Sequence, residues 1–240
     1  MRSKADPART PVVTEPAVEP ETTGDLYRIR GQWRSGADEV GLRERNKLEK
    51  VERITSAARR QFANKGYDGT TLRDIAKEAH VALGTLGFYA ENKRDLVLLI
   101  FNETMPPILE KSKKAGVYEG SLVEALSKFF RPAFTAYAEK PDLHRTVLRE
   151  NVFHSRSPHA REFHRIRTET IGLVRDLIQQ ARAAGEIRPY IDVELGARTV
   201  FFLFFAVVRW WLAAERPEVE LGLTEFRSMC ALLLDGMKRD

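Results

Sequence analysis

Apolar residues recur every three to four positions along most of the chain after residue 43, and this spacing predicts amphipathic helices. No stretch shows the strict apolar–polar alternation that is typical of a β-strand, and β-branched residues are sparse. Gly66, Gly185 and the pair Pro106–Pro107 are expected to end helices, and Asn92 to begin one. The predicted helices cover about residues 45–65, 71–79, 82–89, 93–105, 119–138, 141–154, 158–184, 193–214 and 223–238. The fold class is therefore predicted to be all-α.

The first 42 residues differ from the rest and form a predicted flexible extension. Residues 1–23 are rich in Pro, Thr and Glu and have no hydrophobic periodicity, which is typical of disorder. Between residues 24 and 42, arginines alternate with apolar residues, which fits either a short packing segment or a basic arm for DNA. The helical part divides by its motifs into residues 43–92 and residues 93–240.

Two short predicted helices, residues 71–79 and 82–89, are joined by a turn at His80 and Val81. This is the minimal helix-turn-helix, whose second helix enters the major groove of DNA. Apolar positions of this segment can close a small core with the first long helix; they are Leu72, Ile75, Ala76, Ala79, Val81 and Leu86. Spacing alone leaves an ordinary helical hairpin as the alternative.

The residue types in this segment favour the DNA-binding interpretation. From Lys65 to Leu96 the chain reads KGYDGTTLRDIAKEAHVALGTLGFYAENKRDL, and with Phe62 before it this segment resembles the tetracycline-repressor (TetR) family of bacterial transcriptional regulators. The resemblance covers about residues 45–101. It implies an N-terminal three-helix helix-turn-helix domain followed by a larger helical domain that binds a ligand and dimerises.

The resemblance also implies which residues meet DNA. Thr71, Thr85 and the hydroxyl of Tyr89 would contact phosphates, and Lys93 would add its charge at a helix N-terminus. Gly84 would let the backbone approach the strand closely. The expected DNA-binding residues are Arg45, Thr71, Arg73, Ala82, Leu83, Gly84, Thr85, Phe88, Tyr89 and Lys93.

Four positions depart from the family pattern. His80 stands where Gly is usual and is expected to adopt the left-handed conformation, which His tolerates better than most residues. Ala82 replaces a capping Ser, and Gly87 replaces a Tyr that often contacts phosphate. Ala90 replaces a core Phe, and Phe88 is expected to refill the lost volume.

The helix expected to read DNA has few groups that distinguish base pairs. From Val81 to Ala90 there is no Arg, Lys, Asn or Gln, the side chains that hydrogen-bond base edges best. Specificity is expected instead from contacts of Ala82, Leu83 or Phe88 with thymine methyl groups, from polar contacts of Arg73 or Thr85, and from DNA shape.

The C-terminal part carries two strongly apolar helices. Residues 200–212 read VFFLFFAVVRWWL, which is apolar on nearly every face and must be covered on all sides. Either an intramolecular core or a second copy of the chain could cover them, and a homodimer is favoured because little chain remains. The expected interface residues are Phe201, Phe205, Val208, Trp211, Phe226, Met229, Cys230, Leu233 and Met237.

The middle helices are rich in aromatic residues, which fits either plain core packing or an apolar ligand cavity with a few polar groups. The expected pocket residues are Phe129, Phe130, Phe134, Tyr137, Asn151, His154, Phe163 and Phe204. The histidines between residues 144 and 164 lack the helical spacing of metal ligands, so neither a metal nor a cofactor is expected.

Composition limits the remaining choices. A chain of 240 residues with 43% hydrophobic residues can bury a large core, and the net charge of +5 permits an anionic partner without requiring one. The single cysteine, Cys230, excludes an intrachain disulfide and fits the cytoplasm. The longest apolar run is too short to span a bilayer, and no signal peptide is evident.

These observations favour a homodimeric, cytoplasmic repressor that binds double-stranded operator DNA and is released by a small apolar or aromatic effector. The alternative is a dimeric ligand sensor or protein-binding module whose helix-turn-helix no longer binds DNA specifically. An enzyme is not expected, because the sequence offers no catalytic residues: no nucleophile beside a base, no paired carboxylates and no phosphate-binding loop.

Overall fold

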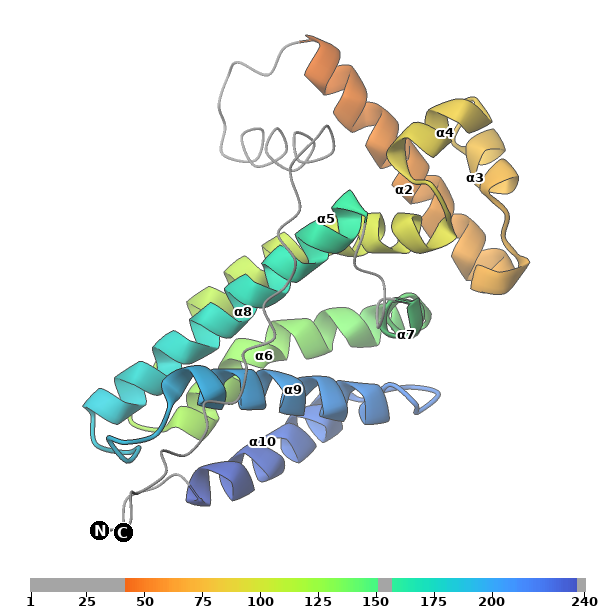
Figure 1. Cartoon of the computed structure of the whole chain (residues 1–240). Helices are drawn as coiled ribbons and strands as arrows, with labels where there is room; N and C mark the ends of the chain where they lie inside the picture. The colour runs from red at the N-terminus through yellow and green to blue at the C-terminus, as the bar shows by residue number, and fades with distance from the viewer. Residues whose placement is uncertain (1–41, 151–156, 237–240) are drawn as a thin grey trace, which may run out of the picture.

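The computed structural model describes residues 42–150 and 157–236, and every regular element in these two ranges is an α-helix (Figure 1). The order of the helices along the chain confirms the predicted all-α class. They are α2 (Leu42–Gly69), α3 (Leu72–Glu78), α4 (Leu83–Tyr89), α5 (Lys93–Ala115), α6 (Leu122–Glu139), α7 (Pro141–Glu150), α8 (Pro158–Ala183), α9 (Val193–Trp211) and α10 (Val219–Asp235).

Helices α2, α3 and α4 form the expected DNA-binding unit at one end of the molecule (Figure 1). Their core is built from small and aliphatic residues, such as Ile54 of α2, Ile75 of α3 and Leu86 of α4. Helix α5 completes this core with Leu96, Leu99 and Ile100. Neighbouring α5 residues face the larger core instead, so α5 belongs to both halves of the molecule.

Helix α2 is broken where the sequence predicted its end. Gly66 has a φ of 71° and a ψ of 167°, outside the helical region, and the chain resumes a last helical turn up to Gly69. The hydroxyl of Thr70 then donates to the carbonyl oxygens of Gly66, at 2.7 Å, and of Gln61, at 3.1 Å. These bonds hold the start of α3 against the end of α2.

The predicted end of α5 at Pro106 and Pro107 is wrong, because the helix continues to Ala115. Each proline removes a backbone donor and disfavours helical conformation in the preceding residue, so the sequence indicated a stop. Met105 before the prolines and Ile108 and Leu109 after them are all buried. Burial of this continuous apolar face on both sides offsets the two lost hydrogen bonds.

The larger half packs α5, α6, α8, α9 and α10 around an aromatic core. The Phe130 ring stacks on that of Phe204 with centroids 4.2 Å apart, and Phe134 meets Trp211 edge-on at 5.0 Å. Gly222 lets α10 approach this cluster, since a Cβ there would lie 2.8 Å from the Phe134 ring. Burial of the predicted inward face of α6, including Phe129 and Tyr137, is confirmed.

Candidate DNA-binding surface and effector cavity

Helix α4 presents an apolar face to solvent. Phe88 is 71% exposed and Leu83 is 43% exposed, and Ala82, Gly84 and Gly87 lie on the same exposed side. We call these five residues the recognition face. Among the described residues, a Cβ added at Gly84 or Gly87 would meet no heavy atom within 4 Å. Space on this side of the helix is therefore open to a partner.

The turn before α4 has the conformation predicted from the sequence. His80 has a φ of 51°, in the left-handed region that Gly usually occupies, and the expectation for His80 is confirmed. The Val81 amide donates to the carbonyl oxygen of Ala76 at 3.0 Å, which closes the turn. Helix α4 starts after Ala82, whose methyl side chain cannot accept a capping hydrogen bond.

The expected refilling of the core by Phe88 is wrong. Ala90 is buried, but Phe88 is exposed, and its ring lies edge-to-face with that of Tyr89, with centroids 5.5 Å apart. The reason is helical geometry: residues two apart on a helix lie on different faces, so Phe88 cannot enter the core that Ala90 and Leu86 share. The aromatic side chain is left on the recognition face.

Thr71 and Arg73 lie at the start of α3. Thr71 caps the helix: its hydroxyl accepts from the Asp74 amide at 3.1 Å and donates to the Asp74 carboxylate at 2.7 Å. The hydrogen bond from Thr71 holds the pKa of Asp74 below its ordinary value. Arg73 is exposed beside it, as is Arg45 on α2, and Thr85 is half-buried on α4. For Thr71, Arg73, Arg45 and Thr85, contact with DNA stays a prediction.

Tyr89 and Lys93, two expected phosphate contacts, differ from that expectation: Tyr89 is largely buried, and the half-buried Lys93 bonds to the protein's own backbone. Tyr89 is only 9% exposed. The Lys93 ammonium donates to the carbonyl oxygen of Tyr67 at 2.7 Å and lies 4.6 Å from the centre of the Tyr67 ring. It also donates to the carbonyl oxygen of Asp68 at 3.3 Å. These contacts hold the end of α2 and favour a structural role for Lys93.

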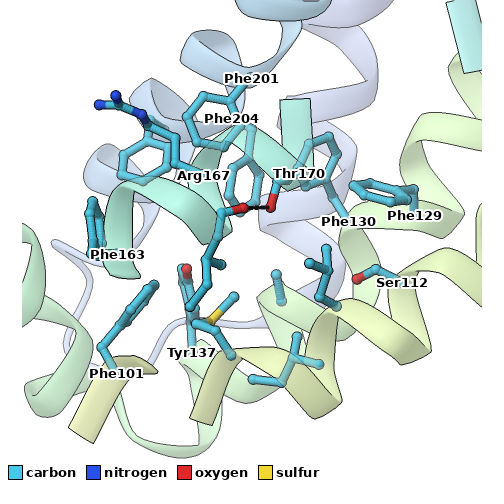
Figure 2. Close-up of a pocket in the computed structure, with 16 residues that line it drawn as sticks. Phe101, Ser112, Phe129, Phe130, Tyr137, Phe163, Arg167, Thr170, Phe201 and Phe204 are labelled. Atoms are coloured by element: carbon cyan, nitrogen blue, oxygen red, sulfur yellow. Dashed lines mark hydrogen bonds between the residues drawn. The ribbon is translucent and has the colours of Figure 1, made fainter. Parts of the chain in front are cut away.

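A cavity of about 40 Å³ lies between α5, α6, α8 and α9 (Figure 2). Five of the expected pocket residues line it: Phe129, Phe130, Tyr137, Phe163 and Phe204. Phe134 does not, because it packs inside the cluster formed by Phe204, Trp211 and Phe226. Asn151 and His154 fall outside the described residues.

Sequence reasoning missed much of the cavity wall. The additional lining residues are Phe101, Met105, Ile108, Leu109, Ser112, Ala133, Ile166, Arg167, Thr170, Phe201 and Phe205. Ile108, Leu109 and Ser112 were missed because α5 was expected to end before Pro106. The apolar residues of α5 at helical spacing after the prolines were the available signal.

The polar residues that line the cavity are Ser112, Tyr137, Arg167 and Thr170, and His144 lies behind Tyr137. Tyr137 stacks on His144, with ring centroids 4.2 Å apart. Burial lowers the pKa of His144 to about 4, although its Nδ1 lies 2.9 Å from the carbonyl oxygen of Lys140. Burial also raises the pKa of Tyr137. Arg167 lies at the edge of the lining residues in Figure 2.

An outer groove of about 470 Å³ adjoins the cavity between α5 and α8. The two spaces share Leu109 and Ile166 as lining residues. The groove also contains Arg165, whose guanidinium bridges Glu162, at 2.8 Å, and Glu169, at 3.0 Å. An elongated ligand could therefore place an apolar tail in the cavity and a polar group in the groove.

Helices α9 and α10 expose a long apolar stripe on the side away from the core. We call it the outer face; it consists of Leu195, Phe202, Trp210, Leu221, Met229 and Leu232. Trp210 is 69% exposed and Leu232 is 77% exposed. Large apolar side chains exposed together on two neighbouring helices fit an interaction site.

The residues expected at the dimer interface are mostly on the opposite side of these helices. Phe201, Val208, Trp211, Phe226 and Cys230 are buried in the core of the subunit, so their assignment to an interface is wrong. Phe205 and Leu233 are half-buried, Met229 is exposed, and Met237 lies outside the described residues. The error arose because α9 is apolar all round, so the pattern does not show which side faces inward.

Comparison with known proteins identifies the chain. One matching family model describes bacterial regulatory proteins of the tetR family, over residues 54–100, and another describes a tetracyclin repressor-like C-terminal domain, over residues 123–209. This chain belongs to the TetR family. The resemblance seen in the helix-turn-helix is confirmed, and the chain is a DNA-binding transcriptional regulator rather than an enzyme.

The relatives of this TetR-family chain include other bacterial transcriptional regulators. It is 24% identical to the fatty acid metabolism regulator protein of Bacillus subtilis (strain 168), over 80% of this chain and 98% of that protein. It is 25% identical to the transcriptional repressor KstR2 of Rhodococcus jostii (strain RHA1), over 73% and 85%. The solved Thermus thermophilus repressor FadR, in complex with lauroyl-CoA, matches with a TM-score of 0.62 and 27% identity, over 79% and 96%.

Within residues 42–150 and 157–236, no group of His, Cys, Asp and Glu side chains is arranged to hold a metal ion. No helix in the same ranges is both long and apolar enough to cross a bilayer.

Proposed function

We propose that this TetR-family chain is a cytoplasmic, homodimeric repressor that leaves its operator when an apolar acyl chain enters the cavity. Residues 43–92 with the start of α5 bind DNA, the remainder to residue 240 binds the effector and dimerises, and residues 1–42 form an extension. The observation that carries the proposal is the position of the cavity: α5 lines it and also closes the core of the DNA-binding unit.

The DNA contacts follow from the exposed groups of the helix-turn-helix. Arg45, Thr71, Arg73 and Thr85 supply phosphate or groove contacts, which fix the register of the protein on DNA. Leu83 and Phe88 project from the recognition face, with Ala82 and Gly84 close to the DNA backbone. Apolar side chains in the major groove distinguish bases by the thymine methyl group, so the operator half-site contains thymines opposite these residues.

The dimer joins the outer faces of two subunits. Helices α9 and α10 lie side by side, and with their copies they would make a four-helix bundle. Ala206 and Ser228, small residues exposed on these helices, allow close approach. Two recognition helices would then face successive major grooves of a palindromic operator.

The effector class follows from the walls of the cavity. Phenyl rings and aliphatic groups dominate, while ligand pockets usually have volumes of about 300–1,000 Å³. A cavity of about 40 Å³ must therefore widen to take any effector. A narrow, flexible alkyl chain needs the least widening, and the relative from Thermus thermophilus binds lauroyl-CoA.

The test is selection of genomic DNA fragments by the purified full-length protein, at a stated salt concentration. Recovered fragments that share a palindrome support the repressor, and lauroyl-CoA should then weaken binding to that palindrome. Coenzyme A alone and lauric acid are the matched controls. Fragments without a common sequence, or a palindrome whose affinity does not respond to any acyl compound, would contradict the proposal.

One observation favours a second candidate, a dimeric ligand sensor that does not bind DNA specifically. The recognition face offers no hydrogen-bonding side chain except the half-buried Thr85 beside it, and Tyr89 and Lys93 are engaged inside the subunit. The same selection experiment decides between the two, because a sensor would bind acyl compounds but would recover no common sequence.

A further inference from the structure

A buried hydrogen bond joins the end of the recognition helix to a helix that lines the cavity. His159, the second residue of α8, places its Nε2 2.7 Å from the carbonyl oxygen of Tyr89, the last residue of α4. A carbonyl oxygen can only accept, so Nε2 carries the proton. The side-chain amide of Asn102 in α5 donates to the carbonyl oxygen of His159 at 2.8 Å. Helices α4, α5 and α8 therefore meet at His159.

Helix α4 depends on contacts of this kind because it is weak by itself. It has seven residues, fewer than an isolated helix needs, and Gly84 and Gly87 lower its helical propensity further. The last carbonyl groups of a helix have no partner within that helix. His159 supplies the partner for Tyr89, so the direction in which Leu83 and Phe88 point depends on where α8 holds the end of α4.

We propose that His159 is a positioning residue that ties the tilt of α4 to the width of the cavity. The proposal rests on the effector-released repressor described above. One turn beyond His159, the ring of Phe163 lies 5.0 Å from that of Phe101 in α5, and both rings line the cavity. The cavity and the groove beside it both lie along α5 and α8, so an alkyl chain that widens the cavity of about 40 Å³ changes the spacing of these two helices.

Separation of α5 and α8 acts directly on the bonds at His159. Asn102 is adjacent to Phe101 on α5, and His159 precedes Phe163 by one turn of α8. Movement of α8 away from α5 stretches the bond to Asn102, the bond to Tyr89, or both. The C-terminal end of α4 then loses the group that orients it, and the recognition face no longer matches the groove.

A second connection between the larger half and the DNA-binding unit runs through α7 and is an alternative to the bond at His159. Arg149 pairs with Asp68 at 3.3 Å, and Arg94 pairs with Glu150 at 3.1 Å. Arg149, Asp68 and Arg94 are exposed, so water and salt screen these pairs. Helix α7 contributes Pro141–Glu150, and none of these residues lines the cavity. The buried bond at His159 is the more direct route.

Three substitutions of His159 test the proposal, with Thr168→Leu as the control on an exposed site of α8. His159→Leu keeps the volume and removes the donor. His159→Gln keeps an amide donor at about the reach of Nε2, and should restore the bond. His159→Asn is too short to reach Tyr89, and replaces the Leu variant if that protein does not fold.

The first measurement is hydrogen exchange in the protein alone, followed at the amides of Leu86 and Ala90, which bond within α4. We expect exchange to accelerate about tenfold in His159→Leu, to return to the parent rate in His159→Gln, and to stay unchanged in Thr168→Leu. The Ile75 amide in α3 should not change in any variant. Unaltered exchange in α4 of the Leu and Asn variants would overturn the positioning role, whether or not the protein binds DNA.

The second measurement is the ratio of operator affinities without and with lauroyl-CoA. Coupling between two sites is typically 5- to 150-fold, and we expect His159→Leu to reduce the ratio by at least fivefold while lauroyl-CoA affinity is kept. His159→Gln should keep most of the ratio. A parent protein that does not respond to lauroyl-CoA contradicts the proposed function, and the exchange result then decides the role of His159 alone. Full coupling in His159→Leu would contradict the link between the cavity and α4.

Discussion

Two surfaces of this TetR-family regulator expose apolar side chains. They differ in size and in the packing of the residues beneath them. The recognition face is carried by one seven-residue helix with two glycines, and Arg73 and Lys77 are exposed on α3 next to it. The outer face extends along α9 and α10, which have 19 and 17 residues. A small apolar face among cations suits a DNA groove, whereas a long stripe on two rigid helices suits a second protein subunit.

The difference shows that exposure alone does not identify a binding surface; the packing beneath it does. Under the outer face lie Phe201, Phe204 and Trp211, buried in an aromatic core that fixes both helices. Under the recognition face, α4 buries Leu86 and Tyr89, and the end of α4 is held by His159 from another helix. The outer face is therefore rigid, and the recognition face can be moved.

The largest expected effect is loss of the dimer when charges are placed on the outer face. Phe202→Glu with Leu232→Glu would bury carboxylates between subunits, which costs several kcal/mol. Sedimentation should show a monomer, and operator binding should fall with it. Val117→Glu, at an exposed apolar residue after α5, is the matched control and should remain dimeric. A stable dimer of the double variant would refute the assigned face.

A second prediction concerns the pH dependence of stability, which the buried His144 of α7 should dominate. Burial lowers the pKa of His144 to about 4 from 6.5, so the unfolded chain binds a proton there more readily than the folded protein. Stability from neutral His144 is present above pH 6.5 and is lost as the pH falls toward 4, by about 3 kcal/mol in total.

Urea denaturation between pH 7.5 and pH 4.5 measures this loss. His144→Phe, which keeps a ring against Tyr137, should reduce the dependence on pH. Equal pH dependence of the parent and the His144→Phe variant would show that other groups account for the acid response.

The same substitution at two glycines should give opposite results. Gly222→Ala places a methyl group 2.8 Å from the Phe134 ring and 3.0 Å from Trp211, which should destabilise the protein by about 1–3 kcal/mol. Gly87→Ala meets open space among the described residues and raises helical propensity, so stability should rise by up to about 1 kcal/mol. Thermal denaturation of both variants checks the contrast. A destabilised Gly87→Ala would mean that the recognition face is packed rather than open.

Operators in which deoxyuridine replaces thymine test how the recognition face reads DNA. If Phe88 contacts a thymine methyl group, removal of that methyl should weaken parent binding about fivefold to tenfold, or about 1 kcal/mol. Phe88→Ala should lose the same amount on the normal operator and nothing more on the substituted one, in a double-mutant cycle. Leu83→Ala should respond at a different thymine. Additive losses would exclude direct methyl contact.

The smallest expected effect concerns Lys93, whose contacts are inside the subunit. Lys93→Ala should lower the melting temperature slightly, because the carbonyl groups of Tyr67 and Asp68 lose their donor. The dependence of operator affinity on salt should keep its slope. A slope reduced by about 0.9 would instead show that Lys93 neutralises a phosphate, as the family resemblance implies.

The sequence predicted those features that depend on local conformation. The break at Gly66, the left-handed turn at His80 and the cap at Asn92 are set by which backbone angles and hydrogen bonds single residues allow. The helix-turn-helix followed from two short predicted helices joined by a turn, and the family followed from the resemblance of about residues 45–101, because that motif is local. The inward face of α6 was also predictable, since its apolar residues lie on one side.

The tertiary structure decided what the pattern left ambiguous. Helix α5 continues through Pro106 because neighbouring helices bury the apolar residues on both sides of it. Helix propensity does not include the free energy gained by this burial. Helix α9 is apolar all round, so only packing against Phe134 and Phe226 determined that Trp211 points inward and Trp210 outward. The bond from His159 to Tyr89 joins residues 70 positions apart, and contacts of that range arise only when the helices pack together.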